Sequence, residues 1–262
     1  MDQDTIASIR ERVSKVKWYH SFEIAPGVMT PGITAFDAAS FLDGFGVSRQ
    51  LNGLRALDIG TWDGPMAFEL ERRGAEVVAV DILDPAETAF NTAKEILGSR
   101  VRHIQASVYD LTTVLKGEKF DVICFLGVYY HLKYPLLAFE QIRQVMTPRG
   151  LVLLEGACLL NYAETLNGQA APQPMLDAVR TLAKSDVPLS LCYAGRFTGA
   201  SNWFIPNLAC IRAWLQAAGF KLEKQYLIDQ PDAKPIPLQR FSGTAVASSH
   251  EVFEEHPLHF TR

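Results

Sequence analysis

The sequence lacks the features that mark membrane and secreted proteins. Its 262 residues contain no unbroken apolar run of about 18 residues, the length that a membrane-spanning helix needs. The first residues carry neither the basic segment nor the apolar core of a signal peptide. We therefore expect a cytoplasmic protein without a membrane partner.

Metal-binding patterns and a strong positive charge are also missing. The four cysteines show no Cys-x-x-Cys spacing and the six histidines form no His-x-x-x-His pair, so we expect no metal site. The net charge of -4 gives no general basic field for nucleic acid. A hydrophobic content of 48% nevertheless indicates an ordinary globular protein.

The chain does contain short apolar runs that alternate with helical patterns. This alternation predicts a doubly wound α/β fold with a seven-stranded, mostly parallel sheet. The expected strands are residues 55–59, 75–81, 101–106, 120–126, 151–154, 220–228 and 244–248. The helices expected between or beside them are residues 64–73, 84–97, 135–146 and 206–218.

Two segments stand apart from this alternation. Residues 1–50 are expected to form an N-terminal helical arm, with one helix over residues 35–45 capped by Thr34. Residues 51–262 form the main domain, and residues 157–203 lack the strand–helix rhythm. We interpret that stretch as a lid insertion with one helix near residues 175–184.

A turn between the first strand and its helix carries the strongest functional signal. Residues 58–64 read Asp-Ile-Gly-Thr-Trp-Asp-Gly, and Asp81 ends the next strand. Ligands bind beyond the carboxyl ends of such strands, where an acid can accept hydrogen bonds from ribose hydroxyls. A pyrophosphate prefers a third glycine and no acids, whereas Asp58 and Asp63 favour a cation. S-adenosylmethionine carries both an ammonium and a sulfonium group.

These residues resemble motif I of the class I methyltransferases, which have a Rossmann-like fold. Residues 125–131 (Phe-Leu-Gly-Val-Tyr-Tyr-His), followed by Pro135-Leu136, are similar to a segment of the bacterial tRNA wobble-uridine (5-hydroxyuridine) methyltransferases. That family also resembles the chain in Asn202, Phe204-Ile205-Pro206, Trp214-Leu215 and Gly219-Phe220. The resemblance implies methyl transfer from S-adenosylmethionine, with S-adenosylhomocysteine as the product, and an arm that covers the cofactor.

The resemblance also implies roles for individual residues. Gly60, Thr61 and Gly64 would line the methionine and ribose parts, Asp81 would bind the ribose, and Ser107 and Val108 would border adenine. Leu126 and Tyr130 would lie at the sulfonium end, where Tyr130 with Trp18 or Trp62 holds the cation. The whole expected cofactor-binding set is Asp58, Gly60, Thr61, Trp62, Gly64, Asp81, Ile82, Ser107, Val108, Leu126, Tyr130 and Trp18.

The chain departs from the wobble-uridine enzymes where those enzymes hold a carboxylated cofactor with basic residues. His20 stands near the place of a lysine, and Ser201 near the place of an arginine. A second carboxylate would be poorly compensated without those cations. We therefore expect plain S-adenosylmethionine.

Three residues are candidates for catalysis. His131 is the best candidate base, because its pKa class suits deprotonation of a hydroxyl near neutrality. The alternative for His131 is a hydrogen bond to the loop backbone. Tyr130 and His20 are the other two candidates, and a structural role competes with catalysis at His20.

Three functions remain open from the sequence. The first is O-methylation of a small-molecule hydroxyl, on a natural product, a sugar or a similar metabolite. The second is tRNA wobble-uridine methylation, which needs a basic surface; the only proposed cluster is Arg143, Arg149, Arg180 and Lys184. The third is a non-catalytic binding protein with a methyltransferase fold. The sequence does not determine the oligomeric state.

Overall fold

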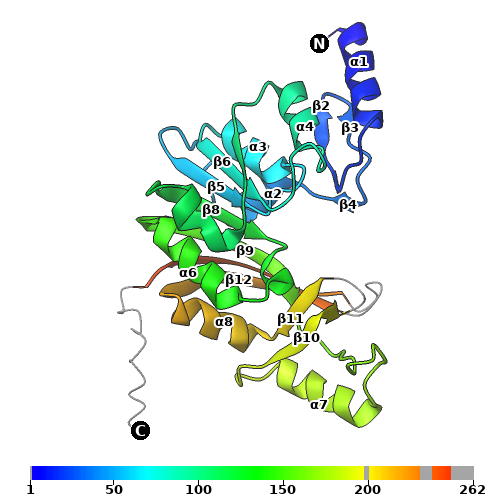
Figure 1. Cartoon of the computed structure of the whole chain (residues 1–262), viewed down its shortest axis with the longest axis vertical. Helices are drawn as coiled ribbons and strands as arrows, with labels where there is room; N and C mark the ends of the chain where they lie inside the picture. The colour runs from blue at the N-terminus through cyan, green and yellow to red at the C-terminus, as the bar shows by residue number, and fades with distance from the viewer. Residues whose placement is uncertain (1, 198–200, 231–237, 249–262) are drawn as a thin grey trace. The chain divides into compact units, whose positions relative to one another are not determined.

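The computed structural model describes residues 2–197, 201–230 and 238–248. It divides into two compact units, Met1–Cys124 with Val145–Thr147, and Phe125–Gln144 with Pro148–Arg262. The central sheet has seven strands in the order β12-β13-β9-β8-β5-β6-β7 (Figure 1). The predicted doubly wound, Rossmann-like sheet is thereby confirmed.

The first unit contains the parallel part of the sheet. Strand β5 (Arg55–Ile59) pairs in parallel with β6 (Glu76–Asp81), and β6 pairs in parallel with β7 (Arg102–Gln105). Four of the five β5 residues and five of the six β6 residues are buried, as expected for strands covered on both faces. Strand β8 (Phe120–Leu126) leads from the first unit into the second.

Helices connect these strands where the sequence predicts them, with one correction. Helix α3 (Pro65–Arg72) follows β5, and α4 (Phe90–Leu97) follows β6. The predicted helix start at residue 84 is wrong, because Ala89 adopts a left-handed conformation with φ of 65°. Asp84 accepts the N–H of Ala86 in a turn instead. The helix therefore begins only after Ala89.

The N-terminal arm combines two helices with four very short strands. Helix α1 (Gln3–Ser14) precedes β1 (His20–Ser21), β2 (Glu23–Ala25), β3 (Val28–Met29) and β4 (Thr34–Ala35). Helix α2 (Ala38–Gly44) begins later than predicted: its cap is Asp37, which accepts the N–H of Ser40 at 2.9 Å, and the predicted cap Thr34 lies in β4. β1 and β4 pair in parallel.

The second unit holds the antiparallel part of the sheet. Strand β9 (Met146–Cys158) pairs with β13 (Leu238–Ala247), which pairs with β12 (Phe220–Gln230). All three strands are longer than predicted. Helices α6 (Pro135–Val145) and α8 (Leu208–Ala217) belong to this part of the chain.

The insertion between β9 and α8 has more structure than its sequence suggests. It contains α7 (Gln173–Ala183), as predicted, and an unpredicted antiparallel hairpin of β10 (Ser190–Phe197) and β11 (Asn202–Pro206). A cluster of buried residues forms its own core: Ala157, Leu159, Ala163, Ala171, Val179, Ala183, Tyr193, Phe197 and Ile205.

The two ends of the insertion meet at its base. The N–H of Leu159 donates to the carbonyl of Pro206 at 2.8 Å. Next to it, the fully buried Asn207 accepts the N–H groups of Leu189 and Cys210. Its amide donates to the carbonyl of Leu182 in α7 and to that of Val187 in the α7–β10 connection. The insertion is therefore closed at its base.

Candidate functional site

The turn between β5 and α3 has the backbone geometry that its glycines permit. Gly60 and Gly64 have φ angles of 76° and 88°, and Trp62 also lies in the left-handed region at 50°. A Cβ atom at Gly64 would lie 2.5 Å from the Phe68 ring. The N–H groups of Gly60 and Thr61 both donate to the carbonyl of Val80. These two groups therefore stabilise the fold and do not bind an anion.

Asp81 joins this turn to the end of β6. Its two carboxylate oxygens accept the N–H groups of Trp62 and Leu83, each at 2.9 Å. The residue is only 5% exposed. Each carboxylate oxygen accepts more than one hydrogen bond, so capacity remains for donors from a ligand.

Asp58 and Thr61 interact with each other, yet each carries a buried polar atom that makes no well-formed hydrogen bond within the described residues. These atoms are Oδ2 of Asp58 and Oγ1 of Thr61. Burial raises the pKa of Asp58 to about 6, and the neighbouring charge of Asp81 adds to the shift. Buried polar atoms normally have partners, so this turn offers acceptor sites that a ligand with N–H or O–H donors would satisfy.

The arm is fastened to the same turn through Asp63. Asp63 is fully buried, and its Oδ2 accepts the N–H groups of Tyr19 and His20 at 2.9 and 2.8 Å. Its Oδ1 forms a close contact with Nδ1 of His20. The predicted candidate His20 is thus brought directly to the turn by Asp63, which the sequence analysis named for its charge but did not include among the site residues.

Two aromatic residues of the arm, Trp18 and Tyr19, differ in their contacts with the turn. Tyr19 packs on Trp62 with ring centroids 5.1 Å apart. Trp18, predicted to contact the cofactor, is buried in the arm and donates its indole N–H to the carbonyl of Val13 at 2.8 Å. Its cofactor contact stays a prediction.

The remaining predicted residues of the first unit follow β6 and β7. Ile82 comes directly after β6 and is 69% exposed. Ser107 accepts the N–H of Tyr109 and so caps the short helix η1 (Val108–Asp110), in which Val108 is buried. These positions lie past the carboxyl ends of their strands, as predicted.

In the second unit, Leu126 ends β8, and Tyr130 and His131 lie in the short helix η2 (Tyr129–His131). The Nδ1–H of His131 donates to the carbonyl of Ser201 at 3.2 Å. Desolvation lowers the pKa of His131, and the positive charge of Arg240 lowers it further. His131 is therefore neutral near pH 7, with its free lone pair on Nε2.

Tyr130 has a neighbour that sequence reasoning missed. The guanidinium of Arg240 lies over the Tyr130 ring, 5.5 Å from its centroid. Arg240 also forms two hydrogen bonds of 2.6 Å with the carboxylate of Glu155. The Tyr130 ring therefore lies among Arg240, the ring of His131 at 4.2 Å and the core of the insertion, and its contact with the sulfonium stays a prediction.

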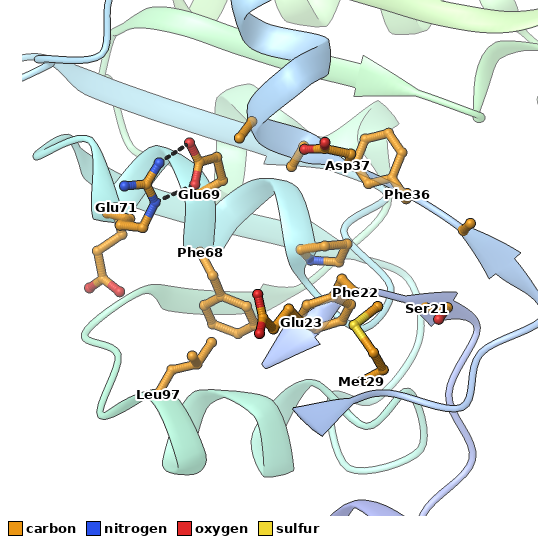
Figure 2. Close-up of a pocket in the computed structure, with 15 residues that line it drawn as sticks. Ser21, Phe22, Glu23, Met29, Phe36, Asp37, Phe68, Glu69, Glu71 and Leu97 are labelled. Atoms are coloured by element: carbon orange, nitrogen blue, oxygen red, sulfur yellow. Dashed lines mark hydrogen bonds and ion pairs between the residues drawn. The ribbon is translucent and has the colours of Figure 1, made fainter. Parts of the chain in front are cut away.

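A cavity of about 920 Å³ opens elsewhere on the first unit (Figure 2). Residues of the arm, of α2 and of α3 line it, and none of the predicted site residues is among them. Its carboxylates serve the fold: Glu69 binds Arg72, and Asp37 caps α2 (Figure 2 labels both acids). We assign this cavity no part in the site.

The proposed basic cluster does not gather on one surface. Arg143 lies in α6 and Arg149 in β9, whereas Arg180 lies in α7 and pairs with Asp177. Figure 1 shows α7 separated from α6 by α8 and the β10–β11 hairpin. Among the described residues, no group of three or more acidic, histidine or cysteine side chains could hold a metal, and no helix is long and apolar enough to cross a membrane.

Comparisons with known proteins identify the family and the fold. A family model described as a methyltransferase domain matches residues 37–225. The tRNA U34 carboxymethyltransferase of Pseudomonas aeruginosa is 27% identical over 173 residues, 65% of this chain and 46% of that protein. The ubiquinone biosynthesis O-methyltransferase of Azorhizobium caulinodans is 31% identical over 106 residues, 40% of this chain and 41% of that protein. The matched parts thus span less than half of these relatives.

One solved structure resembles almost the whole chain. The N-terminal domain of EvdMO1, solved with S-adenosylhomocysteine bound, has a TM-score of 0.61 and 16% sequence identity. The match covers 94% of this chain and 98% of that one. At this identity the likeness establishes the fold.

Proposed function

Because this chain belongs to the family of methyltransferase domains, we propose that it transfers a methyl group from S-adenosylmethionine to a hydroxyl of a small molecule. The observation that carries the proposal is the set of carboxylates where β5 and β6 end. Asp58, Asp63 and Asp81 are all buried there. This concentration of negative charge suits a cationic cofactor.

The residues present fit S-adenosylmethionine. The orphaned Oδ2 of Asp58 and Oγ1 of Thr61 need donors, which the cofactor's ammonium supplies. Asp81 retains acceptor capacity for the ribose hydroxyls. When bound, the cofactor supplies an electrophilic methyl group on a sulfonium, and the protein's task is to align the acceptor with it and exclude water.

A hydroxyl acceptor is supported by two imidazoles. The Nδ1 atom of His20 contacts Asp63, and the Nδ1 atom of His131 contacts the carbonyl of Ser201. With Nδ1–H donating, each ring carries its lone pair on Nε2, the form that accepts a proton from a hydroxyl.

We assign recognition of the acceptor to the insertion and η2. Tyr130 packs against the core of the insertion. The buried Oδ1 atoms of Asn161 and Asn202 find no partner in the described protein. Unpaired buried amide oxygens suit a small molecule that carries hydroxyl donors.

The proposal is tested in two steps. Calorimetric titration measures binding of S-adenosylmethionine and S-adenosylhomocysteine, and a screen with methyl-labelled donor then compares hydroxyl compounds, amines and tRNA. Label on a small-molecule hydroxyl is the expected result. Label confined to amines or tRNA, or the absence of cofactor binding, would overturn the proposal.

Wobble-uridine methylation of tRNA is the second candidate. The similarity to the tRNA U34 carboxymethyltransferase of Pseudomonas aeruginosa favours it. The separation of Arg143 from Arg180 weighs against it, because tRNA binding needs a continuous basic surface. Retention of unmodified tRNA by the protein at about 150 mM salt would favour this candidate.

A further inference from the structure

We propose that His20 is the general base that accepts the proton of the acceptor hydroxyl, and that Asp63 is the residue that positions it. The inference rests on the proposed function and deepens it. It replaces His131, the best sequence-based candidate, with a histidine of the arm.

The His20–Asp63 pair has the geometry of an oriented base. Asp63 is fully buried, and it receives the two backbone N–H groups of Tyr19 and His20 as well as the imidazole Nδ1. A carboxylate with these three donors is held in one orientation. It fixes the proton of His20 on Nδ1 and leaves Nε2 as the acceptor, as a buried aspartate does in hydrolase triads.

The backbone of His20 is equally constrained. Its carbonyl accepts the hydroxyl of Thr30 at 2.7 Å, and β1 pairs with β4 at this residue. A Cβ atom on Gly32 would lie 2.1 Å from the His20 carbonyl carbon, so only glycine fits there. The Phe36 ring lies 5.5 Å from the imidazole. A side chain with 19% exposure is thus held from several directions while part of it stays accessible.

The charges around the two histidines differ in sign. The carboxylate of Asp63 contacts the His20 ring, whereas the positive charge of Arg240 acts on His131. At His131, desolvation and the charge of Arg240 oppose the imidazolium. Of the two imidazoles, His20 is therefore the one whose ring a carboxylate orients, and we assign the base to it.

Methyl transfer and loss of the hydroxyl proton then take place together. The acceptor oxygen forms a bond to the methyl carbon, the carbon–sulfur bond breaks, and its electron pair remains on sulfur as a neutral thioether. The hydroxyl proton passes to Nε2 of His20. The imidazolium, stabilised by Asp63, then releases that proton to water.

Two substitutions separate catalysis from folding. His20→Asn places an amide N–H where Nδ1 lies, so the contact with Asp63 is kept and the base is lost. Asp63→Asn keeps an oxygen for the backbone N–H groups of Tyr19 and His20, but its amide N–H reverses the imidazole tautomer. His131→Asn is the matched comparison at the other histidine.

The first readout needs no acceptor. In the full-length protein saturated with S-adenosylhomocysteine, ¹⁵N NMR of the imidazoles reports which nitrogen carries the proton. We expect His20 to be protonated on Nδ1 and unprotonated on Nε2 at pH 8, and Asp63→Asn to reverse this. A wild-type His20 with its proton on Nε2 would overturn the proposal.

The second readout uses the hydroxyl compound that the labelled-donor screen identifies. His20→Asn is expected to lower kcat by about 10²–10⁴ with affinity for S-adenosylhomocysteine within about threefold, and its remaining rate is expected to rise with pH as the acceptor ionises. Hydroxyl methylation that survives His20→Asn, or a larger loss in His131→Asn, overturns the base assignment. A methyl group found only on nitrogen refutes the proposed function instead.

Discussion

Replacing Asp58 with asparagine is expected to change how the stability of the cofactor-free protein depends on pH. The pKa of Asp58 is raised from 3.8 to about 6, mainly because its charge is buried. The folded protein therefore binds this proton more tightly than the unfolded chain does. The resulting stabilisation is complete below the unfolded pKa and is lost as the pH rises through the folded pKa.

The size of this effect follows from the two pKa values. Integrating the linkage from pH 8 down to pH 5 gives the wild type about 1.4 kcal/mol of stability relative to a variant without this group. Below pH 4, the stability that the wild type gains over this variant approaches about 3 kcal/mol. His103 and His131, whose pKa values are lowered, act in the opposite direction, but they are present in both proteins and cancel in the difference.

Urea unfolding of wild type and Asp58→Asn at pH 5 and pH 8 measures this double difference. A second signature is expected with ligand, since the ammonium of S-adenosylhomocysteine favours the ionised carboxylate. Affinity of the wild type should therefore fall below about pH 6, and affinity of the variant should be weaker and nearly independent of pH. If the pH dependence of the unfolding free energy is the same in both proteins, or differs in the opposite sense, Asp58 is not a buried acid with a raised pKa.

Three further predictions concern the same turn and the cofactor. Asp81→Ala is expected to weaken S-adenosylhomocysteine binding by tenfold or more in calorimetric titration, because the ribose loses its acceptor; unchanged affinity would remove Asp81 from the site. Gly64→Ala should lower the free energy of unfolding by about 2–4 kcal/mol, because a Cβ there meets the Phe68 ring in a left-handed conformation; wild-type urea unfolding would contradict this. Plain S-adenosylmethionine should compete at least as well as its carboxylated analogue, because His20 and Ser201 stand where cations are expected; a clear preference for the analogue would favour tRNA methylation.

The sequence predicted the parallel strands because their burial leaves continuous apolar runs. Strands β5 and β6 have such runs, and acids lie at their carboxyl ends: Asp58 is the penultimate residue of β5, and Asp81 is the last residue of β6. Helix starts were less predictable, since several polar residues near each start can cap it. Asp37 rather than Thr34 caps α2, and the left-handed Ala89 delays α4, which no local pattern reveals.

The partners within the site escaped sequence reasoning because they are distant along the chain. Asp63 lies 43 residues from His20, and Arg240 lies 85 residues from Glu155. Spacing rules describe neighbours within one element, and these pairs form only after the arm and β13 are in place. The sequence marked Asp63 only as an acid that favours a cationic ligand, and no local pattern pointed to His20 as its partner.

The closed base of the insertion has a consequence for how such a chain changes during evolution. A hydrogen bond of 2.8 Å joins Leu159 to Pro206, so the end of β9 and the start of α8 are held close together. This distance does not depend on the length of the insertion between them. Doubling the length of a flexible loop costs only about 0.6 kcal/mol in closure entropy, and this insertion brings its own core. Outside the core residues that it shares with β9, the sequence of the insertion is therefore free to lengthen, shorten or be exchanged. If the insertion recognises the acceptor as proposed, such changes would alter the acceptor and leave the carboxylates of the first unit as they are.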